Sequence, residues 1–567
     1  FVLWGGVSIF WSLNPHRTLV EFLQLVCYGL VFLLASRLEA ENLFRLGRIA
    51  WLAGTGAALF AISQHLFLFP GRVSGTFTNP NPFAIYLAML FFIGWGYYLR
   101  GTVKTVPRLH QSDRWAAAGS LLLLTALLLS GSRGAFIAML MATPFLFWGS
   151  GKKELAKMVL RTALIFVLAL LLTQALMSLA PLIQETLSPP SALINFLARP
   201  ESFIATSGTG RLAFMEVAGR LALQEPLQGY SLGTFYLAYN LGYPGDIWFS
   251  RFAHNHYLQT IAELGLIGFA LLAAFLLLTM LKVWQCLRRN DFPGFLPGSF
   301  AAMIAFLLHI GVDFSWNFPG AAVIFFAIAG GAAAVSIPGR VSDMKAPILR
   351  KALPAALLFL LFLLTAWQYT GQLLFQQGIR LEAAGDLSGA AAAYRRAVAL
   401  YPINSIFHYH AARSYYHLTL PEGGPRRLAE TLEVLEQAVR FSPADSALHH
   451  RLGIIHQEAG NLAEAEKHLS LAVRYAGYRI GMYLELASFY LRQERLAEAE
   501  AVSVQALALE EVALRRAEME GELHLKEDLY RLYLLLAELY GKTGRDKEAA
   551  YYAAKAELLL AAEASAE

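Results

Sequence analysis

The stretch that decides the fold lies at residues 253–281 and reads AHNHYLQTIAELGLIGFALLAAFLLLTML. Its second half is apolar, and from residue 256 the stretch is long enough to cross the roughly 30 Å hydrocarbon core of a membrane as a helix. Its first half carries histidine, asparagine and glutamate side chains. Polar groups at such a place are costly unless they have partners or face water. The stretch therefore predicts a membrane helix that begins at a polar functional site.

The overall composition also indicates a membrane protein. Of the 567 residues, 56% are hydrophobic and 15% are charged, whereas soluble domains carry about 25% charged residues. The net charge of +5 comes without a long basic run or interleaved aromatic and basic residues, so no nucleic-acid partner is expected. The two cysteines, Cys27 and Cys286, lie in or beside apolar runs and support neither a disulfide framework nor a cysteine metal site.

Eleven apolar runs predict an all-α, polytopic transmembrane bundle of about 11–12 spans. They cover roughly 1–13, 19–36, 49–69, 82–99, 115–130, 135–149, 159–179, 256–281, 297–312, 319–337 and 352–373. The first run begins at Phe1 without a methionine, so we expect that span to be truncated.

Lysine and arginine residues divide the loops into two alternating sets. The loops near 37–48, 100–114, 152–157, 282–289 and 340–351 are rich in both residues, and short basic loops stay cytoplasmic. The alternate loops at 70–81, 131–134 and 313–318 carry few positive charges or none. We therefore expect those loops, the long loop at about 180–255 and everything after residue 374 to lie outside the cytoplasmic membrane.

The sequence changes character after the membrane domain, which we place at 1–373. In the tail, 374–567, the segment Gly460-Asn461-Leu462-Ala463-Glu464-Ala465-Glu466 returns 34 residues later as Arg495-Leu496-Ala497-Glu498-Ala499-Glu500. This period resembles that of tetratricopeptide (TPR) repeats. About five units fit, with insertions near 420–426 and 512–527. Such an α-solenoid presents a concave face to a protein or peptide partner; the alternative is an irregular helical bundle.

Two arginines on the expected outer side are candidates for binding an anion. Arg133 lies between Ser132 and Gly134 at a tight turn on the expected outer side. A positive charge there is unusual, because lysine and arginine are enriched in cytoplasmic loops. It either reaches the lipid headgroups or binds a phosphate, whose geometry matches a guanidinium fork. Arg211 follows Gly208-Thr209-Gly210 at an expected helix start, where free backbone N–H groups favour an anion.

His254 is the candidate base. A neutral imidazole at the membrane boundary can accept a proton from a sugar hydroxyl near pH 7, although many histidines are structural. Asn255, next to it, and Glu263, nine residues later, are candidate substrate-binding residues. Asp313 ends a span on the same face and either orients His254, pairs with an arginine or is a solvated span end.

The loop at 75–83 contributes two asparagines. Asn79 and Asn81, in an Asn-Pro-Asn-Pro run, either start the next helix or line the site. The sequence contains no HExxH, no CxxC pair, no DxD-type carboxylate pair and no Walker A loop. It therefore indicates neither a metal nor a cofactor at this site, and favours transfer from a donor already activated by a phosphate link.

Three segments together resemble the O-antigen ligase and polymerase family of bacterial surface-polysaccharide enzymes. They are Gly131-Ser132-Arg133-Gly134-Ala135, Gly210-Arg211 with Gly229-Tyr230-Ser231-Leu232-Gly233, and His254-Asn255-His256-Tyr257-Leu258 with Glu263 and Gly265. The resemblance covers roughly residues 1–337. One departure is Met215, where the family pattern has an aromatic residue four positions after the loop arginine.

The resemblance implies a metal-independent, inverting glycosyltransferase of the cytoplasmic membrane. Its donor would be an undecaprenyl-pyrophosphate-linked glycan, held among membrane lipids, and its acceptor a glycan chain, lipid A core or a protein hydroxyl. Arg133 and Arg211 would bind the pyrophosphate, and His254 would activate the acceptor. Two other readings remain open: a transporter or flippase of lipid-linked sugars, and a non-enzymatic scaffold whose repeats assemble a polysaccharide complex.

Overall fold

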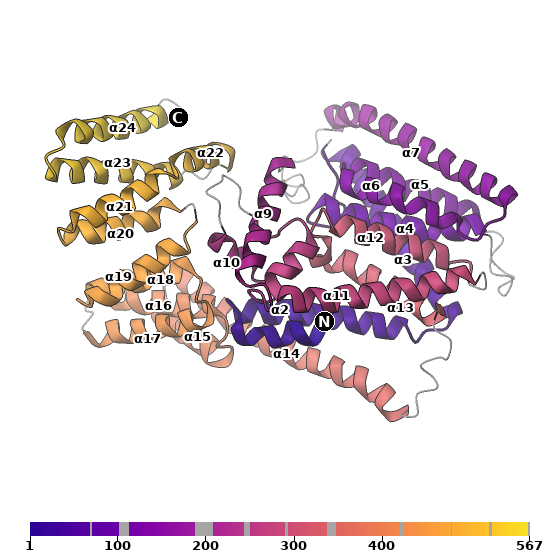
Figure 1. Cartoon of the computed structure of the whole chain (residues 1–567), viewed down its shortest axis with the longest axis horizontal. Coiled ribbons are helices and arrows are strands. Elements are labelled where there is room, and N and C mark those ends of the chain that lie inside the picture. Colours follow the sequence, from indigo (N-terminus) through magenta and orange to yellow (C-terminus); the bar gives the residue numbers. More distant parts are fainter. Residues whose placement is uncertain are drawn as a thin grey trace.

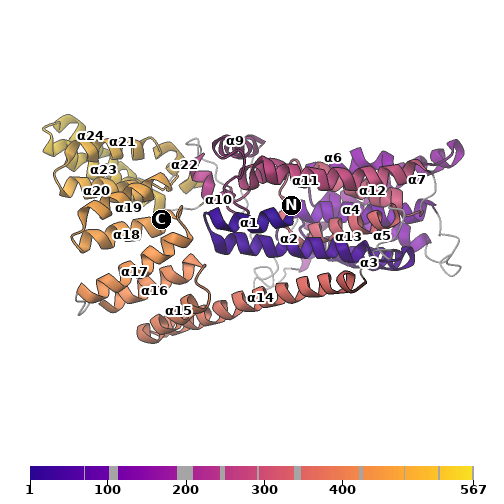
Figure 2. The same cartoon turned by 60° about the horizontal axis from the view of Figure 1, so that its bottom comes forward.

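The computed structural model describes residues 1–68, 71–100, 113–187, 208–242, 250–289, 293–336, 347–419, 425–477, 479–520 and 524–564. In these residues every regular element is a helix (Figure 1), so the predicted all-α fold is confirmed. An apolar helical bundle is followed by a stack of amphipathic helix pairs (Figure 2). Parts of the predicted loops lie outside the described residues, namely 101–112, 188–207, 243–249, 337–346 and 420–424.

The apolar part of the chain forms the predicted bundle, since each of the eleven runs coincides with an apolar helix. Seven of these helices are long and apolar enough to cross a membrane. They are α2 (Pro15–Ala35), α3 (Ala40–Phe67), α4 (Pro80–Arg100), α7 (Lys152–Leu187), α11 (His256–Arg288), α13 (Pro319–Ser336) and α14 (Pro347–Ala383). The shorter ones are α1 (Val2–Val7) with η1 (Ser8–Trp11), α5 (Asp113–Leu129), α6 (Arg133–Ala142) with η2 (Thr143–Phe147), and α12 (Leu296–Ile310).

Helix α4 lies at the centre of the bundle, where it packs against α3, α5, α12 and α13. Small residues let its neighbours approach closely, as is usual between membrane helices. A Cβ on Gly298 of α12 would lie 2.5 Å from the carbonyl oxygen of Phe92, and one on Gly94 would overlap the Trp51 ring of α3. This tight packing fixes the ends of α4 and α12, and those ends carry candidate site residues.

Helix α11 is broken at Gly265, which has φ 65° and ψ −174°. The backbone of residues 226–231 runs beside the break and exchanges hydrogen bonds of 2.6 to 3.0 Å with residues 262–266. Backbone groups at membrane depth require such partners. The first turns of α11, which begin directly after His254, are thereby held apart from the long span that follows.

Replacing Gly265 with alanine is expected to destabilise the protein by about 2 kcal/mol or more. A Cβ there would lie 2.1 Å from the carbonyl oxygen of Leu227, and the positive φ disfavours any side chain. Thermal unfolding of the detergent-solubilised protein measures the effect. Gly56→Ala in α3 is the matched control, because its Cβ would meet nothing within 4 Å. Equal unfolding temperatures for the two variants would contradict this role of Gly265.

The described residues of the C-terminal part form five antiparallel helix pairs, in agreement with the predicted number of repeats. The first pair consists of the C-terminal end of α14 and α15 (Leu387–Leu400). The other four are α16 (Ser405–Thr419) with α17 (Pro425–Phe441), α18 (Ser446–Glu458) with α19 (Leu462–Arg474), α20 (Ile480–Arg492) with α21 (Leu496–Leu507), and α23 (His524–Lys542) with α24 (Asp546–Ala564). The additional helix α22 (Glu510–Glu520) falls in the predicted charged insertion.

Four of the turns within these pairs have the same backbone geometry. Each contains one residue with φ between 59° and 82°, namely Gly385, Gly460, Glu494 and Gly544. The following N–H group donates to a carbonyl five residues earlier at 2.8 to 3.0 Å, which is the helix-ending pattern that a left-handed residue allows. The 34-residue step from Gly460 to Glu494 therefore corresponds to one structural repeat, and the predicted TPR solenoid is confirmed.

Helix α14 carries the chain from the bundle into the repeat array and runs without a break through the expected boundary at residues 373 and 374. Three hydrogen bonds join described residues of the array to one end of the bundle, and the longest runs from Asn14 Nδ2 to the Ser442 hydroxyl at 3.4 Å. Asn240 Nδ2 donates to the Tyr475 carbonyl at 2.7 Å, and His16 Nδ1 hydrogen-bonds with the Tyr401 hydroxyl at 2.9 Å. The array thus adjoins the end of the bundle where α2 begins (Figure 2).

Candidate active site

The turn that follows α12 gathers several of the predicted site residues. Asp313 is 1% exposed, and its carboxylate accepts hydrogen bonds from the Ser315 hydroxyl and from Asn81 Nδ2, the latter at 3.1 Å. His309 Nε2 lies 3.5 Å from the same carboxylate. Burial alone would raise the pKa of Asp313, but His309, Ser315 and His254 together hold this pKa below its usual range. Asp313 is therefore a buried anion and not a solvated span end.

Asn81 connects this turn to a third arginine, Arg72, which was not among the residues predicted from the sequence. Its Oδ1 accepts from Arg72 Nη2 at 2.9 Å, and Arg72 Nε donates to the Ser130 carbonyl at 2.8 Å. The loop before α4, the turn before α6 and the turn after α12 are thus tied together. Asn79 accepts from the N–H of Asn81 at 2.9 Å, which is a helix-starting role. Arg72 could have been found, since it too is an arginine in a loop otherwise poor in positive charge.

His254 lies beside this turn in an uncommon backbone conformation, with φ 53°. Its ring stacks on Phe214 at 5.2 Å between centroids and meets the edge of Phe314 at 4.6 Å. Nδ1 is buried and has no hydrogen-bond partner among the described residues, whereas Nε2 is not fully enclosed. Non-glycine residues keep positive φ where the surroundings impose it, often at functional sites.

The environment keeps the His254 imidazole neutral. Burial lowers the pKa of His254 to about 4; the charge of Asp313 opposes this shift and that of Arg211 adds to it. Near pH 7 the ring is therefore unprotonated and has one free lone pair. A neutral imidazole with an accessible nitrogen can act as a proton acceptor.

Arg211 reaches the same turn from the first turn of α9 (Gly208–Gln224). Its Nη1 donates to the Val312 carbonyl at 3.4 Å, and its Nε is buried without a partner among the described residues. One helical turn on, Phe214 supplies the face on which His254 stacks. The aromatic side chain expected at Met215 is thus present one residue earlier.

Arg133 is the first residue of α6 and its side chain is exposed. It makes no hydrogen bond or ion pair within the part of the chain that the structure describes. The next residue, Gly134, packs on the turn after α12: a Cβ there would lie 3.3 Å from Val312 and 3.4 Å from His309 Nδ1. Val312 is therefore next to both arginine-bearing segments.

Two of the predicted residues have structural partners. Asn255 caps α11, where its Oδ1 accepts from the N–H of Leu258 at 3.1 Å. The Glu263 carboxylate accepts from the N–H groups of Gly233 and Phe235 at 2.9 and 3.2 Å, and so holds the start of α10 (Phe235–Ala238). The structure thus brings together His254, Arg211, Asp313, Asn81 and the Arg133 turn, while Glu263 belongs to a neighbouring cluster.

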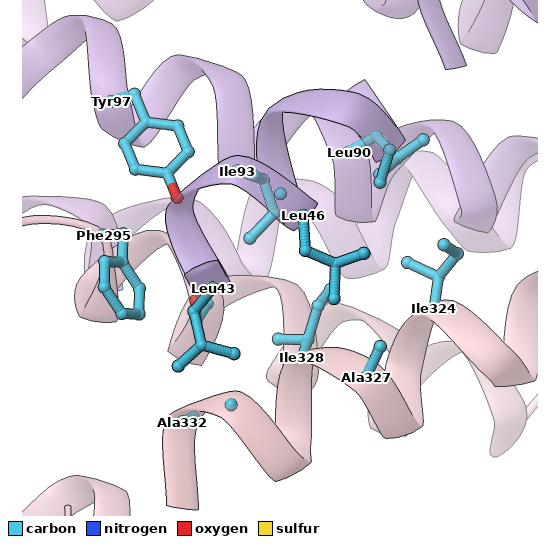
Figure 3. A pocket seen from close by; sticks show the side chains of 14 residues that line it. Leu43, Leu46, Leu90, Ile93, Tyr97, Phe295, Ile324, Ala327, Ile328 and Ala332 are labelled. Atoms are coloured by element: carbon cyan, nitrogen blue, oxygen red, sulfur yellow. The ribbon is translucent and has the colours of Figure 1, made fainter. Parts of the chain in front are cut away.

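An apolar pocket lies elsewhere in the bundle, between α3, α4, α12 and α13 (Figure 3). Figure 3 shows leucine, isoleucine, phenylalanine and tyrosine side chains around it. No charged residue is among those that line it. Its polar side chains are the neutral hydroxyls of Tyr97 and Ser299, whereas the turn after α12 adjoins arginine, histidine and aspartate side chains, so the chemistry is assigned to that turn.

The fold and the site define a multi-pass membrane protein with a cationic, histidine-bearing site at one end of its helices and an attached repeat solenoid. Residues 118–273 match the model of the O-antigen ligase family. The matched segment contains Arg133, Arg211, His254 and Glu263, and it confirms the resemblance that the motifs indicated. Over this segment the chain is similar to O-antigen ligases. A comparison with curated proteins found no match.

Several solved structures are similar to about a third of the chain. MamA is 19% identical, with 33% of this chain and 96% of MamA covered and a TM-score of 0.25. YrrB, a TPR protein, is 17% identical, with 33% and 84% covered and a TM-score of 0.25. TTC0263, a TPR protein of Thermus thermophilus, is 25% identical, with 35% and 98% covered and a TM-score of 0.24. We base the repeat assignment on the helix pairs themselves.

Proposed function

We propose that this protein transfers a glycan from an undecaprenyl-pyrophosphate donor to an acceptor hydroxyl at the extracytoplasmic face of the cytoplasmic membrane. Arg211 and Arg133 bind the pyrophosphate, and His254 activates the acceptor. The observation that carries the proposal is that three segments far apart in the sequence meet on one turn. Gly134 and Arg211 both contact Val312, and His254 packs on Phe314 two residues later.

The proposed reaction is a single displacement at the anomeric carbon. His254 Nε2 accepts the proton of the acceptor O–H group as the oxygen attacks this carbon. The bond between the anomeric carbon and the phosphate oxygen breaks, and undecaprenyl pyrophosphate leaves with the electron pair. The protonated imidazole is stabilised by the buried carboxylate of Asp313, whose charge acts on His254. Attack opposite the leaving group inverts the anomeric configuration.

The arginines supply the positive charge that the leaving pyrophosphate needs. A guanidinium is always charged and matches phosphate oxygens with paired donors. Arg133 is exposed, and the guanidinium of Arg211 makes one long hydrogen bond of 3.4 Å, so both have donors to offer a ligand. Arg72 is already engaged by Ser130 and Asn81 and serves to position the loops. In this proposal the charge on the leaving group is neutralised without a metal.

Extracytoplasmic location of the site is part of the proposal and has a separate test. The loop charges favour it, and the contact of Asn240 with Tyr475 puts the repeat array at the same end of the bundle as α10. A periplasmic-type reporter fused after residue 400 should be active, and a cytoplasmic reporter at the same place should be inactive. The opposite result would reverse the topology. The array itself is proposed to bind a protein partner that presents the acceptor.

The activity is tested with purified protein in detergent and an undecaprenyl-pyrophosphate-linked oligosaccharide as donor. Lipid A core, the same glycan and a serine- or threonine-containing protein are offered in turn as acceptors. We expect a new glycosidic product by mass spectrometry together with released undecaprenyl pyrophosphate. Movement of the donor across proteoliposomes without any product would instead identify a transporter. Loss of function on deletion of the repeats, with His254 dispensable, would identify a scaffold.

A further inference from the structure

The hairpin formed by α18 and α19 contains a cluster of metal-ligand side chains far from the candidate active site in sequence. His456 lies in the last turn of α18, and Glu464 and His468 lie one turn apart on α19. One ligand atom from each residue lies within 4.8 Å of the other two. The residues come from a short hairpin, so their backbones are held by the turn at Gly460. No short metal motif describes this spacing, which explains why a motif search missed it.

His456 is a buried histidine whose ring nitrogens are unsatisfied. The residue is only 5% exposed, and neither Nδ1 nor Nε2 has a hydrogen-bond partner in the described parts of the chain. Buried polar atoms are nearly always paired, and an exception needs an explanation. A metal ion bound by one of these nitrogens would provide the missing partner.

His468 is held in the orientation that a metal ligand requires. His449 Nε2 lies 3.0 Å from the Pro443 carbonyl, so it donates there and leaves its Nδ1 as an acceptor. His468 Nδ1 lies 3.0 Å from that acceptor and therefore donates to it. This leaves the lone pair on His468 Nε2, which lies 3.8 Å from a carboxylate oxygen of Glu464. Metal-binding histidines commonly use their second nitrogen in such a fixing bond.

We propose that His456, Glu464 and His468 bind a divalent transition-metal ion, with Zn²⁺ as the best match. Two imidazoles and one carboxylate suit zinc, and water would complete four ligands. Bonds of about 2.0–2.1 Å in a tetrahedral site place the donors about 3.3 Å apart, so the cluster closes slightly on binding.

The site would stabilise a hairpin that adjoins the membrane domain. The ring of His449 stacks on Tyr475 at 5.8 Å, and the Tyr475 carbonyl accepts the hydrogen bond from Asn240. Metal binding would therefore reinforce the part of the array that touches the loop after α10. Lys467 opposes binding, because its ammonium group lies 2.8 Å from the Glu464 carboxylate.

The test titrates Co²⁺ and then Zn²⁺ into the full-length protein in detergent, without an affinity tag and after treatment with a chelator. Co²⁺ is the probe because its visible absorption reports its coordination. We expect one Co²⁺ per chain, displaced by one Zn²⁺, and a higher unfolding temperature with metal. Absence of stoichiometric binding would overturn the proposal.

Four variants and one control identify the ligands. His456→Gln and Glu464→Gln should each weaken binding by about 100-fold or more, and His449→Phe by about 10- to 100-fold. Lys467→Met should strengthen binding. His524→Ala, an exposed histidine at the start of α23, should change nothing. Glu464 is half-exposed, so its variant tests the site even if a buried histidine proves necessary for folding. Equal affinity in His456→Gln, Glu464→Gln and the unmodified protein would mean adventitious binding and would overturn the proposal.

Discussion

His254→Ala is expected to lower the rate of glycan transfer by about 10²- to 10⁴-fold, the usual contribution of a general base, while the protein remains inserted and folded. The imidazole lies between Phe214 and Phe314 with Nδ1 enclosed, so its removal leaves apolar rings where the proton acceptor stood. Turnover of the lipid-linked donor by purified variants measures the effect. A wild-type rate in His254→Ala would refute the proposed mechanism.

A second variant separates the base from the backbone conformation. His254 has φ 53°, a region that asparagine tolerates better than most residues. His254→Asn should therefore keep the unfolding temperature close to that of the unmodified protein and still lose transfer. Added imidazole should restore part of the rate in His254→Ala, because the deleted ring leaves a space of its own shape.

The pH dependence of transfer follows from the same surroundings. The base is active when neutral, so kcat/KM should fall as the pH decreases through about 4 and should be level above it, given the depressed pKa of His254. Arg211→Ala removes a positive neighbour and should move the inflection to higher pH. Asp313→Asn removes a negative neighbour and should move it lower. Shifts in the opposite directions would contradict the proposed arrangement.

Most of the fold could be predicted because membrane spans depend on composition and length. The eleven apolar runs correspond to helices and the 34-residue period corresponds to helix pairs, because both patterns depend only on nearby residues in the sequence. The broken geometry of α11 was not predicted. Gly265 needs its positive φ only because residues 226–231 pass beside it, and that approach is a tertiary contact.

The site was predictable only in part, for the same reason. Arg133, Arg211, His254 and Asp313 stood out because charge and polarity are unusual at span ends. The roles of Phe214, Phe314 and His309 were not visible, since aromatic and histidine residues in apolar runs usually belong to the core. Glu263 illustrates the opposite case: its position suggested a ligand, yet its carboxylate accepts two backbone N–H groups of the loop before α10.

Arg211→Ala is expected to reduce kcat by about 10²- to 10³-fold, the effect of removing one preorganised charge from a developing anion. Its guanidinium acts on His254 and donates one hydrogen bond, at 3.4 Å, to the Val312 carbonyl. Arg211→Lys should retain part of the rate, since it keeps the charge and loses the paired donors. Arg220→Ala is the matched control on the same helix, because Arg220 pairs with Glu216 at the surface. Equal losses in the two alanine variants would show that the effect is structural.

Combining Arg211→Ala with Arg133→Ala tests whether both arginines bind the same pyrophosphate. The two segments meet at Val312, because a Cβ on Gly134 would lie 3.3 Å from its side chain and Arg211 donates to its carbonyl at 3.4 Å. If the pyrophosphate binds both guanidinium groups, removing one arginine shifts the donor, and the remaining arginine then stabilises the leaving group less well. The double variant should then lose less than the sum of the two single losses in free energy. Strict additivity, or an unchanged rate in Arg133→Ala, would mean that Arg211 alone binds the leaving group and that Arg133 interacts with lipid headgroups instead.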